Sequence, residues 1–229
     1  MRVRLQRVDT FFSLDEFEHA ALFEDLDYVW DVLKRLPSYI QEVLKPGIEG
    51  EVHAGARIGG PVYIAPGAVV EPGVMIKGPA IIGEGTVVRH GAYIRENVIV
   101  GKNCVVGHAT ELKGVVMLNG AQAPHFNYVG DSVLGQGVNL GAGTRLANMK
   151  NDGSEVVVQI DGEAVHTDLR KFGAIVGDRV YTGCNVVASP GTLIGRGTRV
   201  YPGAVLRGAY PPNSIVKVRQ VQEVVSVEY

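Results

Sequence analysis

Aliphatic side chains recur every six residues through the first half of the chain. Stepping by six from Val52 reaches eleven consecutive positions that are all Val, Ile or Leu: Val52, Ile58, Ile64, Val70, Ile76, Ile82, Val88, Ile94, Val100, Val106 and Leu112. The residue four places after each is small or β-branched, as at Ala56, Ala68 and Thr86. An α-helix cannot produce this pattern, because its side chains recur every 3.6 residues. The period therefore indicates a coil of short parallel strands, in which each hexad supplies one flat side and one corner.

Such a coil has an aliphatic interior. Glycines between the hexads accommodate the positive φ that its corners require, and stacked coils pair their backbones at a spacing of about 4.8 Å. A second run keeps the same period: Val176, Thr182, Ala188, Ile194, Val200 and Leu206. A short link joins the two runs: Leu134, Leu140 and Leu146. With three hexads in each coil, the sequence predicts a mainly β protein of roughly seven to eight coils.

The repeat is flanked by two segments without it. Residues 1–48 contain apolar positions at helical spacing: Val29, Trp30, Leu33 and Leu36. We expect two or three short helices here that cap the open end of the first coil, whose strand edges are otherwise unpaired. A docking surface for a partner enzyme is the alternative. The β-helix is expected over residues 49–210, and the Val-rich tail, 211–229, is expected to pair with or cover the last coil.

The period breaks at two places. From Leu112 to Leu134 the spacing is 22 residues, which is two short of four hexads. The second break spans about 147–174, where apolar stretches on either side of Asp161 and Gly162 predict a hairpin. We expect this segment to form an arm that could reach a neighbouring subunit. Function is expected at such breaks, because a loop can leave a solenoid without unravelling it.

Composition and charge exclude several classes of protein. The 229 residues are 46% hydrophobic and 20% charged, as in a globular domain. The net charge of -2 provides no general attraction to nucleic acid or to acidic membranes. The two cysteines, Cys104 and Cys184, form no CxxC pair, which argues against a disulfide scaffold or a zinc finger. No apolar run approaches about 18 residues and no secretory core is found at the N-terminus, so a cytoplasmic protein is expected.

Two adjacent motifs carry a family resemblance. His125 to Asp131 reads His-x-x-Tyr-x-Gly-Asp, and Asn139 to Gly143 reads Asn-x-Gly-Ala-Gly. Together they closely resemble the acetyltransferase domain of the bifunctional glucosamine-1-phosphate acetyltransferase/N-acetylglucosamine-1-phosphate uridylyltransferases. The arm, with Arg170 to Asp178, is similar to that of archaeal sugar-1-phosphate nucleotidylyltransferases with a fused acetyltransferase. The six-residue period resembles the hexapeptide-repeat transferases, and the resemblance covers roughly Val88 to Leu206.

The resemblance implies a fold, an assembly and a reaction. It implies a left-handed parallel β-helix and a homotrimer with active sites between neighbouring helices. It also implies transfer of an acyl group, expected to be acetyl, from coenzyme A to an amino-sugar 1-phosphate, with acetyl-CoA as cosubstrate. No metal, nucleic acid or membrane is implied. The family's nucleotidylyltransferase domain has no counterpart in this sequence, and its basic C-terminal tail is not evident.

The resemblance assigns the reacting end of the site to four residues. His125 matches the general base, and an imidazole suits that role because its ordinary pKa is near neutral. Asn139 matches an asparagine at the sugar and the thioester. Ala142 matches an alanine whose backbone meets coenzyme A, and Cys184 stands where the family has a coenzyme-binding serine. Backbone N–H groups in the turn from Gly141 to Gly143 could stabilise the oxyanion.

Five further positions match substrate-binding residues. Arg95 and Lys113 match cations that hold the phosphate and the substrate, and Lys171 matches a lysine near the sugar. Together these three would clamp a phosphate dianion. Tyr128 matches the tyrosine that binds the sugar phosphate, and Asn148 matches the asparagine that opens the arm. No acyl-enzyme is expected, since Cys104 falls on an interior position.

Two other functions remain open on the sequence. One is a non-catalytic module that binds a sugar nucleotide or acts as a scaffold for a separate nucleotidylyltransferase. The other is a zinc hydratase of the γ-carbonic anhydrase type, which shares the fold and needs two histidines five residues apart. No pair of the six histidines has that spacing: His19, His53, His90, His108, His125 and His166. His90 and His108 are expected to lie one coil apart on the surface.

Overall fold

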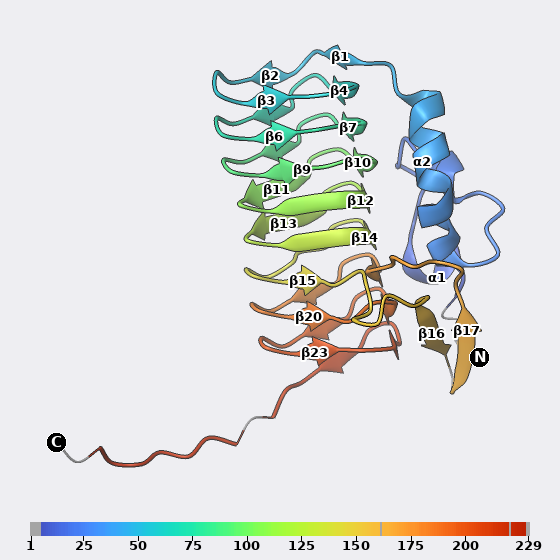
Figure 1. The fold of residues 1–229 in the computed structure, drawn as a ribbon, viewed down its shortest axis with the longest axis vertical. Helices are drawn as coiled ribbons and strands as arrows, with labels where there is room; N and C mark the ends of the chain where they lie inside the picture. The colour runs from blue at the N-terminus through green and yellow to red at the C-terminus, as the bar shows by residue number, and fades with distance from the viewer. Residues whose placement is uncertain (1–5, 161, 220, 228–229) are drawn as a thin grey trace.

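The computed structural model describes residues 6–160, 162–219 and 221–227. The repeat forms a left-handed parallel β-helix with three faces, as the six-residue period and the family resemblance together predict (Figure 1). The first face stacks β1 (Gly47–Ile48), β4 (Val62–Ile64), β7 (Ala80–Ile82), β10 (Val98–Val100), β12 (Glu111–Met117), β14 (Tyr128–Leu134), β18 (Ala174–Val176), β21 (Thr192–Ile194) and β24 (Ala209–Tyr210). These nine described strands exceed the predicted seven to eight coils, because irregular coils extend the stack beyond the hexads at both ends.

The other two faces are built in the same way. The second face consists of β2 (Glu51–Val52), β5 (Val69–Val70), β8 (Val87–Val88), β11 (Val105–His108) and β13 (Gln122–His125), followed lower down by β19 (Tyr181–Thr182), β22 (Arg199–Val200) and β25 (Ile215–Val216). The third face consists of β3 (Arg57–Ile58), β6 (Met75–Ile76), β9 (Tyr93–Ile94), the starts of β12 and β14, β15 (Arg145–Leu146), β20 (Val187–Ala188) and β23 (Val205–Leu206).

The predicted aliphatic positions line the interior. In the ladder Val52 pairs with Val70, Val70 with Val88, and Val88 with Val106, so like residues stack one coil apart. All eleven positions belong to the core, although Val52 and Ile58 in the first coil are only partly buried. The prediction from the six-residue period is therefore confirmed at the level of single side chains.

The first break in the period consists of two places where the chain turns a corner in five residues instead of six. Leu112 and Met117 both point inward but lie five residues apart, as do Val129 and Leu134. As a result β12 and β14 run unbroken from the third face onto the first, and their register is 17 residues, with Glu111 opposite Tyr128. This change of register moves the following loops relative to the regular coils above them.

The N-terminal segment lies along the first face and does not cap the first coil. It contains α1 (Val8–Phe11), two 3₁₀ turns, η1 (Ala20–Phe23) and η2 (Val29–Asp31), and α2 (Val32–Val43) (Figure 1). Its apolar side chains pack on outward residues of the first face that repeat from coil to coil: Ile81, Ile99, Val116, Val133, Ile175 and Leu193. The predicted cap is wrong in position, because burying this continuous stripe removes more apolar surface from water than covering one coil would. Ile48 on the first coil remains 57% exposed.

The arm and the tail complete the chain. β16 (Val157–Ile160) and β17 (Glu163–His166) pair antiparallel, so the predicted hairpin is present. Val156, Val158 and Phe172 of the arm join the core over the first face of their own chain. The tail supplies β25, which pairs with β22 of the last coil as expected, and residues 221–227 extend away from the body (Figure 1). In the described ranges, no helix has the length and apolarity of a membrane span.

Candidate active site

Three histidines occupy successive coils at the corner between the second and third faces. His108 lies opposite His125 in the ladder, and the rings of His90 and His108 stack with their centroids 5.7 Å apart. Nδ1 of His90 lies 2.6 Å from the carbonyl oxygen of Pro72, and Nδ1 of His108 lies 2.9 Å from that of His90. A carbonyl oxygen only accepts, so these contacts place the proton on Nδ1. The stacking of His90 and His108 one coil apart confirms the prediction.

His125 stands on a backbone that is held at several points. Its N–H donates to Oδ1 of Asn127 at 3.1 Å, and its carbonyl oxygen accepts from the N–H of Gly143 at 3.0 Å. Asn127 is buried, and its amide donates to the carbonyl oxygen of Gly141 at 2.9 Å. The imidazole of His125 is exposed, and no other described residue hydrogen-bonds to it. The ring is therefore free to meet a substrate while the chain beneath it is fixed.

Ala142 and Cys184 continue the same corner below His125. The N–H of Gly143 bonds to His125, and the N–H of Asn185 bonds to the carbonyl oxygen of Ala142 at 2.8 Å, so the residues lie in successive coils. Cys184 is exposed. Cys104 is buried, and this burial raises the pKa of its thiol to about 12, which fits its predicted interior position.

The glycine turn offers fewer oxyanion donors than the sequence suggests. The N–H of Gly141 donates to Oγ1 of Thr182 at 2.9 Å, and the N–H of Gly143 donates to the carbonyl oxygen of His125. The N–H of Ala142 donates to no described residue. In the described structure, this turn therefore has one backbone N–H, that of Ala142, left to donate to an oxyanion.

A polar cluster on the third face contains four of the predicted substrate residues. Nζ of Lys113 donates to Oδ1 of Asp131 at 2.7 Å, and the side-chain amide of Asn148 donates to the other oxygen of Asp131. The hydroxyl of Tyr128 donates to Oδ1 of Asn148 at 3.3 Å. Burial, followed by the carboxylates of Glu111 and Asp131, raises the pKa of Tyr128. This hydroxyl is therefore protonated near neutral pH and is available as a donor.

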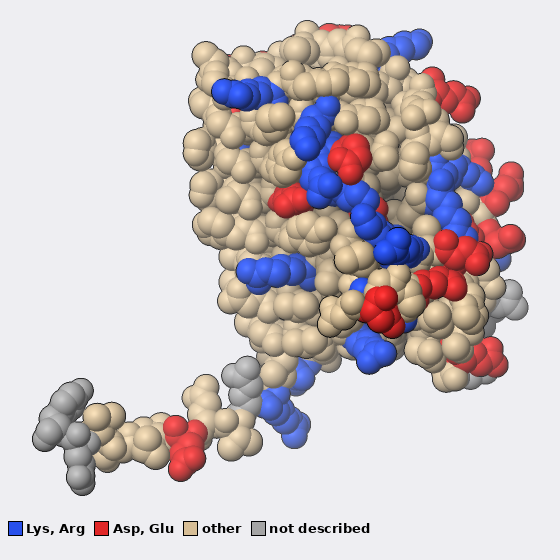
Figure 2. Space-filling view, in the orientation of Figure 1, with Lys and Arg blue, Asp and Glu red and all other residues tan. Residues whose placement is uncertain are grey.

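Arg95 lies one coil above Lys113 in the same cluster. Its guanidinium lies 3.1 Å from a carboxylate oxygen of Glu111 and 3.5 Å from one of Glu96. Basic side chains form a band across this face, with acidic side chains beside it (Figure 2). The two cations expected to grip phosphate are thus paired with carboxylates. The sequence reasoning missed Glu111 and Asp131, although both stand next to or within the quoted motifs.

Two of the predicted substrate-binding residues, Asn139 and Lys171, lie outside this cluster. Asn139 belongs to the second face, where it bridges Gln122 and Tyr181. Lys171 is exposed and has no described contact with the cluster, but the N–H of its neighbour Phe172 donates to the carbonyl oxygen of Asn148 at 2.8 Å. A single chain therefore presents two half-sites, one around His125 at the corner and one around Lys113 on the third face.

Comparison with known proteins gives consistent relatives. A family model described as "GMPPB C-terminal domain" matches residues 76–169. A "Bifunctional protein GlmU" of Methanococcus maripaludis is 44% identical over 204 residues, which is 89% of this chain and 49% of that protein. A "Bifunctional sugar-1-phosphate nucleotidylyltransferase/acetyltransferase" of Sulfurisphaera tokodaii is 47% identical over 96 residues, which is 42% of this chain and 24% of that protein. This chain spans half or less of the length of these relatives.

Solved acyltransferase structures are similar to this chain only at low sequence identity. AntD, an N-acyltransferase from Bacillus cereus, has 15% sequence identity and a TM-score of 0.41, with coverage of 81% of this chain and 87% of that one. The UDP-N-acetylglucosamine acyltransferase of Francisella novicida has 15% identity and a TM-score of 0.40, with coverage of 72% and 62%. The repeat, the paired motifs and the sequence relatives together show that this chain is a hexapeptide-repeat protein resembling the C-terminal acetyltransferase domain of bifunctional GlmU proteins.

Proposed function

We propose that this protein transfers an acetyl group from coenzyme A to the amine of an amino-sugar 1-phosphate, with His125 as the general base. The observation that carries the proposal is the column His125, Ala142 and Cys184 at one corner, beside the polar cluster that starts at Tyr128. The names of the bifunctional relatives support the same chemistry. The corner would receive the thioester, and the cluster would receive the sugar phosphate.

The reaction needs one proton acceptor and one donor to the oxyanion. The sugar ammonium first loses one proton to solvent, and the imidazole of His125 takes the second nitrogen proton as the free amine attacks the thioester carbonyl carbon. The resulting oxyanion is stabilised by the free N–H of Ala142. The C–S bond then breaks, the amide forms, and the imidazolium returns the proton to the leaving thiolate. Holding both substrates in this geometry supplies much of the rate.

The cluster on the third face would recognise the phosphate. A phosphate dianion can replace the carboxylate partners of Lys113 and Arg95, because it carries more charge and three acceptor oxygens. Until then, Asp131 and Glu111 hold the two cations in place. The hydroxyl of Tyr128 and the amide of Asn148 add uncharged donors that fix the orientation of the ligand.

A homotrimer would complete the site. Asn139 and the corner residues lie on one side of the β-helix edge, and the cluster lies on the other. In the proposed trimer, the corner of one subunit would face the third face and the exposed Lys171 of the next. We include coenzyme A and the amino-sugar phosphate as the only small-molecule partners in this proposal.

The test is a transfer assay on the purified protein. Release of free thiol from acetyl-CoA is followed with glucosamine 1-phosphate, galactosamine 1-phosphate and other amino-sugar phosphates. His125→Ala is expected to lower kcat by roughly 100-fold or more. His90→Ala is the matched control, since it removes an imidazole from the same column two coils away, and it should keep the rate. Absence of thiol release across the panel at high enzyme concentration would reject the proposal and favour a module that binds sugar nucleotide without catalysis.

A further inference from the structure

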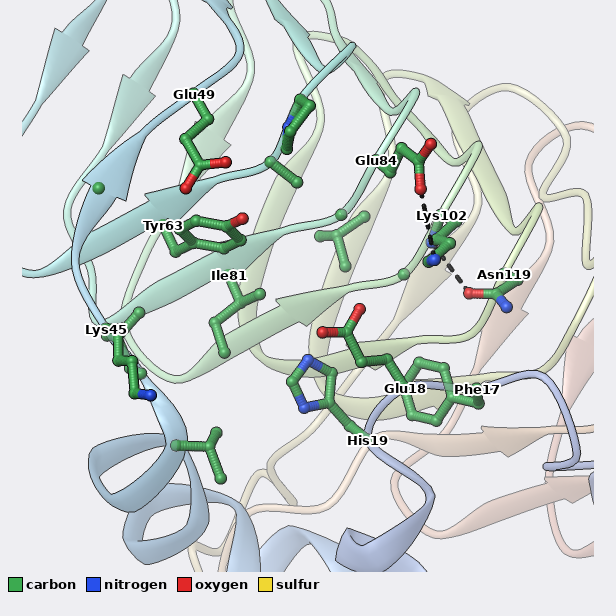
Figure 3. A pocket seen from close by; sticks show the side chains of 18 of the residues that line it. Phe17, Glu18, His19, Lys45, Glu49, Tyr63, Ile81, Glu84, Lys102 and Asn119 are labelled. Carbon is green, nitrogen blue, oxygen red and sulfur yellow. Dashed lines mark hydrogen bonds and ion pairs between the residues drawn. The ribbon is translucent and has the colours of Figure 1, made fainter.

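A cavity lies on the opposite side of the molecule from the histidine column. It has a volume of about 670 Å³ and opens between the N-terminal segment and the upper coils of the first face (Figure 3). Its floor is formed by Tyr63 and Ile81, the outward side chains of β4 and β7, and Phe17 forms one wall. None of the residues assigned to the transferase site lines it.

The cavity exists because the N-terminal segment covers the apolar stripe incompletely. Ile99 and Val116 are fully buried under this segment, whereas Tyr63 at the top of the stripe is only half-buried. The two walls are held together beside the cavity, where the side-chain amide of Asn119 donates to the carbonyl oxygen of Glu16 at 2.8 Å. An apolar floor between fixed walls is typical of a preformed small-molecule site, and the volume lies within the usual range.

Carboxylates face this floor from two sides. Glu49 lies above Tyr63, and Glu18 reaches up from the N-terminal segment (Figure 3). Burial, followed by the charges of Glu49 and Glu18, raises the pKa of Tyr63, so both carboxylates act on the same ring. In the described part of the chain, neither forms an ion pair, whereas Glu84 on the far rim is 3.3 Å from Lys102.

We propose that this cavity binds a small organic cation, with its apolar body on Tyr63 and Ile81 and its protonated amine between Glu18 and Glu49. A charged amine gains a charge-assisted hydrogen bond from one of these carboxylates, a favourable field from the other, and an attraction to the face of the tyrosine ring. An anion of the same shape is repelled by the two carboxylates. A neutral ligand of the same shape gains only the apolar contact. Lys45 also lines the cavity and carries the positive charge that opposes such a ligand, whereas the ammonium of Lys102 is paired with Glu84 (Figure 3).

The test compares three probes of one shape on the full chain. Calorimetric titration with 2-phenylethylamine is expected to give saturable binding at least about 10-fold tighter than that of 2-phenylethanol or 3-phenylpropionate. Equal affinity for the amine and the alcohol, or no saturation by the amine at about 10 mM, would overturn the proposal.

Variants locate the binding. Glu18→Gln and Glu49→Gln should each weaken binding of 2-phenylethylamine at least about 5-fold, while Glu163→Gln on the arm, a matched change of charge, should leave it unchanged. Unaltered affinity in both cavity variants would reject the assignment. Because the cavity lies away from the proposed transferase site, His125→Ala should bind the amine normally, so a failure of either proposal can be recognised separately.

Discussion

The ammonium of Lys113 lies 2.7 Å from Oδ1 of Asp131, across two neighbouring coils, with their side chains only 16% and 14% exposed. In the ladder Lys113 is opposite Gly130, and Asp131 reaches the lysine because it turns the corner with a φ of 42°. The neighbouring pair of Arg95 and Glu111 is more exposed, at 34% for each side chain. The Lys113–Asp131 pair is therefore the contact on this face where loss of one partner should be felt most.

Removing either partner should destabilise the protein, and removing both should cost less than the sum. Lys113→Met leaves Asp131 without its cation, so a loss of about 1–3 kcal/mol in the free energy of unfolding is expected. Asp131→Asn should cost a similar amount, and the double variant should recover part of the combined loss. Urea denaturation measures all three. Lys102→Met, which breaks an exposed pair with Glu84 at 3.3 Å, should change stability by less than about 0.5 kcal/mol. Strict additivity of the two single variants would contradict coupling between Lys113 and Asp131.

Gly107 is expected to tolerate no side chain. A Cβ at this position would lie 1.7 Å from the carbonyl oxygen of Pro124 in the next coil, so the two coils would have to separate. We expect Gly107→Ala to cost about 3 kcal/mol or more. Gly208 is the matched control, because a Cβ there meets open space and only its φ of 85° resists alanine. Gly208→Ala should cost about 1–2 kcal/mol. Thermal unfolding of the two variants compares them directly, and equal costs would refute the close approach of the coils at Gly107.

The two thiols should differ in reactivity. Cys184 is exposed, whereas Cys104 is buried and burial raises the pKa of its thiol to about 12. Alkylation of the native protein near pH 8 should therefore modify Cys184 alone, as followed by mass spectrometry of the intact chain and its peptides. If coenzyme A lies along the proposed corner, its presence should slow this modification. Rapid labelling of Cys104 in the folded protein would contradict its place in the interior.

Stability should fall on acidification through His19. Burial lowers the pKa of His19 from its ordinary value of 6.5, and Nδ1 lies 3.1 Å from the hydroxyl of Tyr39. The unfolded chain therefore binds a proton more readily than the native one. The contribution of His19 is complete above about pH 6.5 and is lost as the pH falls through the lowered folded pKa. Between pH 7 and pH 5, wild type should lose more stability than His19→Gln in chemical denaturation. Parallel losses in the two proteins would show that His19 does not titrate differently on folding.

Much of the β-helix could be predicted because its interior repeats locally. Each inward position from Val52 to Leu112 is set by the six-residue period, and stacking one coil on another follows from it. The position of the N-terminal segment could not be predicted from its own pattern. Its helical spacing shows that α2 has an apolar side but does not say which surface that side meets. The surface that this side meets is indicated instead by the outward apolar residues of the first face, such as Ile81 and Ile99, which occur once in each coil.

The candidate site, like the fold, could be predicted from the sequence only in part. The motif from His125 to Asp131 and the turn around Ala142 can be recognised in the sequence, since their residue types and spacing are local properties. The pairing of Lys113 with Asp131, the use of the Gly141 and Gly143 amides within the coil, and the cavity over Tyr63 depend on contacts between segments far apart in the chain. The sequence thus determined the repeat and the chemistry that each coil carries. Only tertiary packing decided which charges are neutralised, which donors remain free and which apolar surface stays open, because those outcomes depend on neighbours that no local pattern specifies.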